Sequence, residues 1–267
     1  MTRVTVDPHI LQSPAVTNLR DLGGRATADG GRVATGVAYR SAELSDASVL
    51  TDAALADLGI RTVVDLRTDA ERDPRPDQVP AGAQLLVLDA LADLPGGAAA
   101  QLPTLLAGGD VHVLADLDLA GEMLTVYRRL VVGEAARTAY AAFARTVVDP
   151  ERTPVLFHCT AGKDRTGWAA TILLLAAGVD EAGALEEFLA VNPAVRATFA
   201  PLLQQLAAMG GDPELLRPLL EVRAEYLQAA LSTLHEEFGS FQGYLTDGLG
   251  LSTIEVETLR RTLRTDG

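Results

Sequence analysis

One stretch, PVLFHCTAGKDRTG at positions 154–167, places a strand, a tight loop and the start of a helix in immediate succession. The strand is short and apolar, and Gly162 allows the loop to turn tightly. A helix is predicted from about Thr166, and it includes the apolar run from Trp168 to Val179. A buried strand that leads into a helix is the repeating unit of α/β proteins, because parallel strands need a crossover between them. The chain is therefore expected to be an α/β protein.

Other short runs continue this alternation. Strands are predicted at 37–40, 61–66 and 84–88, the last two as buried strands. Further helices are predicted at about 52–58, 121–132, 134–148, 180–190, 197–209, 221–238 and 252–263. The stretch RDPRPDQVP (72–80) is predicted to be a loop because of its prolines. The 267 residues suit one domain with a Gly/Ala/Pro-rich insertion at about 95–110.

The charge balance restricts the possible partners. A formal net charge of −14 and a pI near 4.6 argue against nucleic acid and anionic membranes as partners. No apolar run approaches the roughly 20 residues of a membrane span. The N-terminus lacks the pattern of a secretory signal, so a cytoplasmic protein is expected, or one secreted without a recognisable signal peptide. An anionic substrate would have to be bound by a local positive site.

The loop after the strand offers such a site. Backbone N–H groups from Thr160 through Ala161, Gly162 and Lys163 to Arg165 can form an anion-binding nest at a helix N-terminus. The planar guanidinium of Arg165 matches two phosphate oxygens.

The cysteine that precedes this nest is the expected nucleophile. Cationic neighbours and a helix N-terminus convert a thiol to a thiolate, which makes Cys159 a candidate for attack on phosphorus. Thr166 can donate a hydrogen bond to the sulfur as it leaves. A lone cysteine is more often a buried apolar residue, but the spacing of Cys159, five residues, Arg165 and Thr166 favours a phosphate ring.

The motif HC-x5-RTG resembles the signature loop of the protein tyrosine phosphatase superfamily. Together with NLRDLGG (18–24), YRSAELS (39–45), LGIRTVVDLRTDAE (58–71) and the segment 222–245, it is similar to an atypical bacterial branch of that superfamily. The resemblance implies a central parallel four-stranded sheet flanked by helices, with an inserted helical lid within about 93–132. It also implies activity on phosphotyrosine, sometimes on phosphoserine or phosphothreonine, and on phosphoinositides. In that branch a lysine equivalent to Lys163 helps to bind phosphoinositide phosphates.

The residues around the loop leave several roles open. His158 either orients the loop and supports the thiolate or is satisfied by backbone bonds at a strand end. Lys163 is expected at the rim of the loop, near a second phosphate or simply solvated. Structural roles are favoured for the remaining supporting residues: Arg20, Asp21, Arg40, Asp65 and Arg67.

The general acid is a choice among three aspartates. Asp164 lies inside the loop, whereas Asp89 and Asp93 follow the strand at 84–88. The resemblance implies an aspartate from a separate mobile loop, and proximity to the phosphate favours Asp164. Asp164 is the preferred candidate, with positioning of Arg40 or Arg67 as its alternative role.

No metal or organic cofactor is expected. The chain has one cysteine, and His9, His112 and His235 show no ligand spacing. The alternatives to a protein or lipid phosphatase are a phosphatase of a small phosphorylated metabolite, a phosphate-binding module without turnover, and a rhodanese-like sulfur transferase. The oligomeric state stays open.

Overall fold

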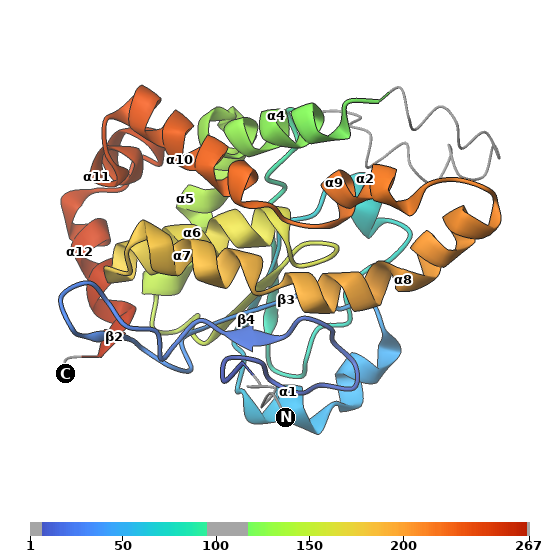
Figure 1. Cartoon of the computed structure of the whole chain (residues 1–267). Helices are drawn as coiled ribbons and strands as arrows, with labels where there is room; N and C mark the ends of the chain where they lie inside the picture. Colours follow the sequence, from blue (N-terminus) through green and yellow to red (C-terminus); the bar gives the residue numbers. More distant parts are fainter. Residues whose placement is uncertain (1–6, 95–116, 266–267) are drawn as a thin grey trace, which may run out of the picture.

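A mostly parallel sheet lies at the centre of the molecule, as Figure 1 shows for the computed structural model, which describes residues 7–94 and 117–265. Four parallel strands follow one another in the order β3 (Ala38–Ser41), β6 (Val155–His158), β4 (Thr62–Asp65) and β5 (Gln84–Val87). A short strand, β1 (Arg20–Asp21), pairs with β3 in the antiparallel direction. The predicted α/β fold with a parallel four-stranded sheet is confirmed, and β1 is an addition to it.

The two faces of the sheet pack against different hydrophobic cores. On β4 and β6, Val63 and Leu156 belong to one core, whereas their neighbours Val64 and Phe157 belong to the other. Successive side chains of a strand point to opposite faces, so strands covered on both sides need apolar residues throughout. Both strands are buried along their whole length.

Helices cover the sheet and flank it, and α4 and α10 lie side by side (Figure 1). The C-terminal end of α6 is set by Gly178, which has a φ of 93°. The helices of the larger core are α4 (Leu119–Val132), α5 (Glu134–Val148), α6 (Asp164–Ala177), α7 (Glu181–Leu189), α8 (Asn192–Ala208), α9 (Arg217–Leu220), α10 (Ala224–Phe238) and α12 (Thr253–Thr262). The shorter elements are η1 (Ala47–Thr51), α1 (Ala53–Asp57), α2 (Asp69–Arg72), η3 (Pro213–Leu216), α11 (Phe241–Gly243), the π-helical turn η4 (Tyr244–Gly248), and the paired strands β2 (Arg32–Val33) and β7 (Arg264–Thr265).

Some predicted elements differ from the observed ones. The strand at 84–88 was predicted to be buried, and this was wrong: β5 is an edge strand, and Leu85 and Val87 are 43% and 41% exposed. An apolar run does not reveal its place in the sheet, which depends on the order of the strands. Helix α8 begins five residues before its predicted start, and α2 was not predicted. The helix after the loop begins at Asp164, two residues before Thr166.

The predicted insertion at 95–110 lies outside the described residues, so the helical lid stays a prediction. The nearest described helix that follows it is α4. Among the described residues, no helix is both long and apolar enough to cross a bilayer.

Candidate active site

Cys159 follows β6 directly, at the carboxyl edge of the sheet, where α/β proteins place their ligand sites. Its exposed fraction is only 2%. Residues 159–165, called the anion loop here, lead from this cysteine into the first turn of α6. Gly162 has a φ of 66°, and a Cβ there would lie 2.2 Å from the carbonyl oxygen of Ser41. Only glycine therefore fits this turn of the loop.

The carbonyl groups of the anion loop point away from its centre. The amide of Glu43 donates to the carbonyl of Thr160 at 3.1 Å. The side-chain amide of Asn18 donates to the carbonyls of Ala161 and Gly162 at 3.4 and 3.0 Å, and Arg40 donates to that of Gly162 at 2.6 Å. In a trans peptide the following N–H points the opposite way. The N–H groups of residues 161–163 are therefore directed into the loop, the arrangement that binds an anion.

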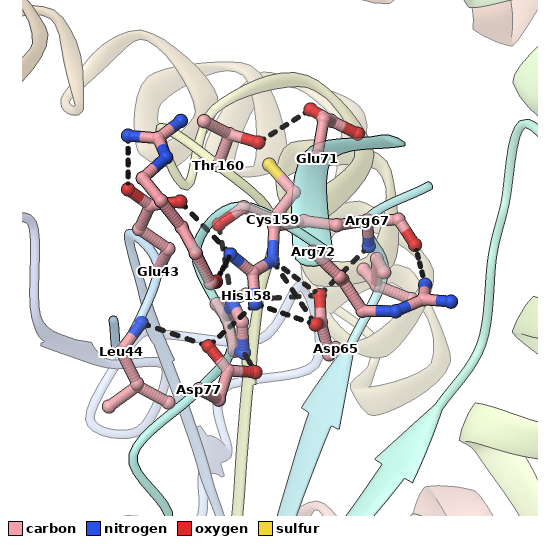
Figure 2. A network of polar contacts seen from close by, with 12 residues as sticks. Glu43, Leu44, Asp65, Arg67, Glu71, Arg72, Asp77, His158, Cys159 and Thr160 are labelled. Carbon is pink, nitrogen blue, oxygen red and sulfur yellow. Dashed lines mark hydrogen bonds and ion pairs between the residues drawn. The ribbon is translucent and has the colours of Figure 1, made fainter. Parts of the chain in front are cut away.

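Arg165 is held by a residue that the sequence reasoning missed. Its Nη1 and Nη2 donate to the two carboxylate oxygens of Glu71 at 2.5 and 2.6 Å. The hydroxyl of Thr160 donates to the same carboxylate at 2.5 Å, as Figure 2 shows. Burial alone would raise the pKa of Glu71, but the hydrogen bonds and charge of Arg165 outweigh it and hold this pKa well below its usual range. A capping box, Thr68-x-x-Glu71, directly after a strand was the available signal for this residue.

We expect Glu71→Gln to lower kcat/KM by about 10- to 100-fold, because one charge-assisted pair that fixes the Arg165 fork is lost. Steady-state kinetics on an aryl phosphate measure this change. Glu255→Gln is the matched control, since Glu255 is also a capping-box glutamate paired with an arginine, Arg145, but at the surface. Equal activity of the two variants would contradict a positioning role for Glu71.

Lys163 and Asp164 contact the surrounding helices. The hydroxyl of Tyr127 on α4 donates to Asp164 Oδ1 at 2.8 Å, and Lys163 Nζ lies 2.7 Å from Asp164 Oδ2. Lys163 Nζ also donates to the carbonyl of Leu219 on α9 at 2.8 Å. Lys163 was expected at the loop rim, but it is only 6% exposed, because α9 covers it. Asp164 thus joins the anion loop to α4, and Lys163 joins it to α9.

These contacts lead to a prediction for Lys163→Met. The loss of the bonds to Asp164 and Leu219 should lower turnover of phosphotyrosine and phosphoinositide by the same factor, and should lower the Tm. Kinetics on both substrates and thermal unfolding measure this. A loss confined to the phosphoinositide would instead indicate that Lys163 leaves Leu219 and contacts a second phosphate.

A buried network of charges supports the strand that carries Cys159. Arg67 donates to both oxygens of Asp65 at 2.8 to 3.1 Å, to Asp77 at 2.7 Å and to Glu43 at 3.0 Å (Figure 2). His158, at the end of β6, lies against the same two aspartates. Asp65 and Arg67 therefore form a structural pair below the anion loop.

Arg40 connects the anion loop to α7. The Nη1 of Arg40 donates to the carboxylate of Glu187 at 2.8 Å, and the other oxygen of this carboxylate lies 3.6 Å from Nε of Arg20. Asp21 accepts hydrogen bonds from the amides of Gly23 and Gly36 at 2.7 and 3.0 Å. Arg20 and Asp21 therefore shape the segment behind the loop, and the structure gives them no contact with its open centre.

The two other candidate acids have different surroundings. Asp93 lies 3.0 Å from Arg129 of α4 and belongs to a surface ion pair. Asp89 lies just after β5. The preceding residue, Leu88, donates its amide to the carbonyl oxygen of Asp65 on β4 at 2.8 Å. Burial raises the pKa of Asp89, although the amide of Leu91 and the charge of Arg165 oppose it. A raised pKa suits a general acid.

Two other features of the described residues are a carboxylate–histidine cluster beside the anion loop and a cleft away from it. Asp65, Asp77 and His158 bring ligand atoms within 4.8 Å of one another, but Arg67 donates to both carboxylates, which is the pattern of an ion-pair network. A cleft of about 1120 Å³ lies between residues 7–35 and α7. Its buried charges are paired with one another, as Arg20 is with Asp7, and Cys159 is not part of its lining.

A parallel sheet with a cysteine–arginine anion loop at its carboxyl edge defines a phosphatase of the cysteine-loop class. Residues 11–265 match the sequence model of the tyrosine phosphatase family, and the chain belongs to this family. It is 37% identical over 251 residues to a protein of Cupriavidus necator that is named as a tyrosine-protein phosphatase, covering 93% of this chain and 87% of that protein. It is 32% identical over 303 residues to the triple specificity protein phosphatase PtpB of Mycobacterium tuberculosis. This match covers 95% of this chain and 99% of PtpB. The chain is a phosphatase that resembles PtpB.

Proposed function

We propose that this phosphatase hydrolyses phosphate monoesters through a phosphocysteine on Cys159. The observation that carries the proposal is the orientation of the loop that follows Cys159, whose carbonyl groups at 160–162 are bonded outward. The N–H groups of residues 161–163 are directed into the loop, and the fork of Arg165 lies beside it with Glu71 fixing its far end. A tetrahedral dianion fits this arrangement of backbone donors and one guanidinium.

In the first step the thiolate of Cys159 attacks phosphorus. The P–S bond forms as the ester P–O bond breaks, and the leaving oxygen takes a proton from an aspartic acid, Asp164 or Asp89. In the second step water attacks phosphorus and gives a proton back to the same aspartate, while the P–S bond breaks and its electron pair returns to sulfur as the thiolate. Inorganic phosphate is released.

Thr166 is the proposed donor to the departing sulfur. Its side chain is fully buried, and its Oγ1 has no hydrogen-bond partner within residues 7–94 and 117–265. A buried hydroxyl without a partner is costly, and such sites often have a functional role. Donation to Cys159 Sγ during turnover would satisfy it. The chain's own residues therefore supply the nucleophile, the anion cradle and a donor to the leaving thiolate.

Phosphotyrosine proteins are the proposed main substrates, with phosphoserine, phosphothreonine and phosphoinositides as further ones. The support comes from the family and from PtpB, whose name describes triple specificity. The test is a panel of phosphopeptides, phosphoinositides and sugar or nucleotide phosphates, ranked by kcat/KM in the presence of a chelator. We expect phosphotyrosine peptides to rank highest and vanadate to inhibit competitively. A sugar or nucleotide phosphate at the top would make this a metabolite phosphatase, and binding without turnover would make it a phosphate-binding module.

A further inference from the structure

Asn18 has a backbone conformation that few residues other than glycine adopt. Its φ is 57°, and it is the one non-glycine residue with a positive φ within the described ranges 7–94 and 117–265. A Cβ crowds the backbone in this left-handed region, although asparagine tolerates it better than most residues. Backbone strain of this kind persists where the surrounding structure imposes it, often at functional sites. The contacts of the Asn18 side chain indicate what imposes it here.

The side-chain amide of Asn18 bonds the backbone of the anion loop. Its Nδ2 donates to the carbonyl oxygen of Gly162 at 3.0 Å and to that of Ala161 at 3.4 Å. Carbonyl oxygens only accept hydrogen bonds, so the nitrogen is the end of the amide that faces the loop. The other end, Oδ1, is buried and has no hydrogen-bond partner among the described residues, which is unfavourable. The contact with the loop is therefore kept in spite of backbone strain and an unpartnered oxygen.

The backbone on both sides of Asn18 is fixed by β3 and by the residue that follows this strand. Before it, the carbonyl of Thr17 accepts a hydrogen bond from the amide of Ala42 at 3.0 Å. After it, Arg20 of β1 is the register partner of Arg40 on β3. A side chain on a backbone that is held on both sides can position a neighbouring loop precisely.

The anion loop needs a restraint at Gly162. Glycine has more freedom than any other residue to rotate the peptide groups on its two sides. If either peptide rotated, a carbonyl oxygen would point at the bound anion in place of an N–H donor. These two peptides are Ala161–Gly162 and Gly162–Lys163, and Asn18 bonds the carbonyl of each. Arg40 adds a second donor to the carbonyl of Gly162 at 2.6 Å.

We propose that Asn18 is a positioning residue: it holds the two peptide groups beside Gly162 so that their N–H groups face the phosphate. The inference rests on the proposed function of the anion loop as the phosphate site. Asn18 acts through the loop backbone, since its donor nitrogen is bonded to the two carbonyl oxygens. The loop then has its binding conformation before the anion arrives, and no affinity is lost in ordering it.

Two substitutions separate the role of the amide from that of the backbone strain. Asn18→Gly removes the amide and relieves the strain, whereas Asn18→Ala removes the amide and places a residue poorly suited to a positive φ. Calorimetry measures the Kd of tungstate, a tetrahedral dianion like phosphate, and thermal unfolding measures the Tm. We expect both variants to bind tungstate about 10-fold more weakly or worse, as for two lost hydrogen bonds. Asn18→Ala should have a lower Tm than Asn18→Gly, whose Tm should stay close to that of the unaltered protein.

Asn192→Ala is the matched control, because Asn192 is the other asparagine of the chain and also bonds a distant backbone. Its Nδ2 donates to the carbonyl of Val222 at 2.9 Å, and its Oδ1 accepts from the amide of the same residue at 3.0 Å. This variant should lower the Tm and leave the Kd of tungstate unchanged. The proposal is overturned if Asn18→Gly binds tungstate as tightly as the unaltered protein, or if only the less stable Asn18→Ala binds it weakly. Absence of tungstate binding by the unaltered protein would refute the proposed function, and this inference with it.

Discussion

Cys159→Ser is expected to lose at least about 10⁴-fold in kcat, as when a nucleophile is removed from other covalent catalysts. A serine hydroxyl needs an adjacent base to attack phosphorus. Within the described residues, the neighbouring His158 is not directed at the side chain of residue 159: its Nδ1 lies 3.1 Å from the carbonyl oxygen of Cys159, and its Nε2 lies 3.0 Å from Asp77. Turnover of a phosphotyrosine peptide measures the loss.

Anion binding should survive in the same variant. Arg165, Glu71 and the N–H groups of the loop are unaltered, so a phosphotyrosine peptide should bind with an affinity close to its KM for the unaltered enzyme. Calorimetry on Cys159→Ser measures this affinity. Arg165→Ala serves as the contrast, since it should abolish binding as well. Substantial turnover by the serine variant would contradict the phosphocysteine mechanism.

The second large effect concerns the general acid, and the contacts favour Asp89 where the sequence favoured Asp164. Both oxygens of Asp164 already have proton-bearing partners, Lys163 and Tyr127. Burial raises the pKa of Asp89, which keeps its proton available at higher pH. We expect Asp89→Asn to lower kcat/KM on a phosphotyrosine peptide by roughly 10²–10⁴-fold. That loss should shrink on p-nitrophenyl phosphate, whose leaving group departs unprotonated.

The pH dependence gives an independent check on Asp89. An acid works only while it is protonated, so activity on tyrosyl esters should fall as pH rises through the raised pKa of Asp89, and Asp89→Asn should lose this descending limb. Asp164→Asn is the comparison variant, and it should slow both ester types equally by loosening the loop. If Asp164→Asn alone shows a loss that depends on the leaving group, Asp164 is the acid.

The parts of the site that are contiguous in the chain were predictable from the sequence. The strand, the anion loop and α6 are neighbours in the sequence, and their spacing alone indicates a phosphate ring around Cys159. The two central strands, β4 and β6, were predictable as well, because strands covered on both faces need continuous apolar runs, whereas the number of strands came from the family resemblance.

The residues that hold the loop were not predictable, because they come from distant segments. Glu71 lies 94 positions from Arg165 and Asn18 lies 144 positions from Gly162. Asp77 stands in the proline-rich stretch 72–80, where proline patterns indicate a loop but not the direction of a side chain. The burial of Lys163 depends on α9, which packs over it from elsewhere in the chain. Sequence patterns predict the local conformation of a segment. Which polar side chains contact one another is decided by the packing of segments that are distant in the sequence.

The single thiol also determines how this enzyme responds to oxidants. A thiolate that is oxidised to a sulfenic acid is usually rescued when a second cysteine condenses with it to a disulfide. Cys159 has no such partner in the chain. Its sulfenic acid has two reversible fates, a ring with a backbone nitrogen or a mixed disulfide with a thiol from another molecule. Without either, the next step gives an irreversible sulfinic acid, so recovery of activity depends on thiols that the protein itself does not carry.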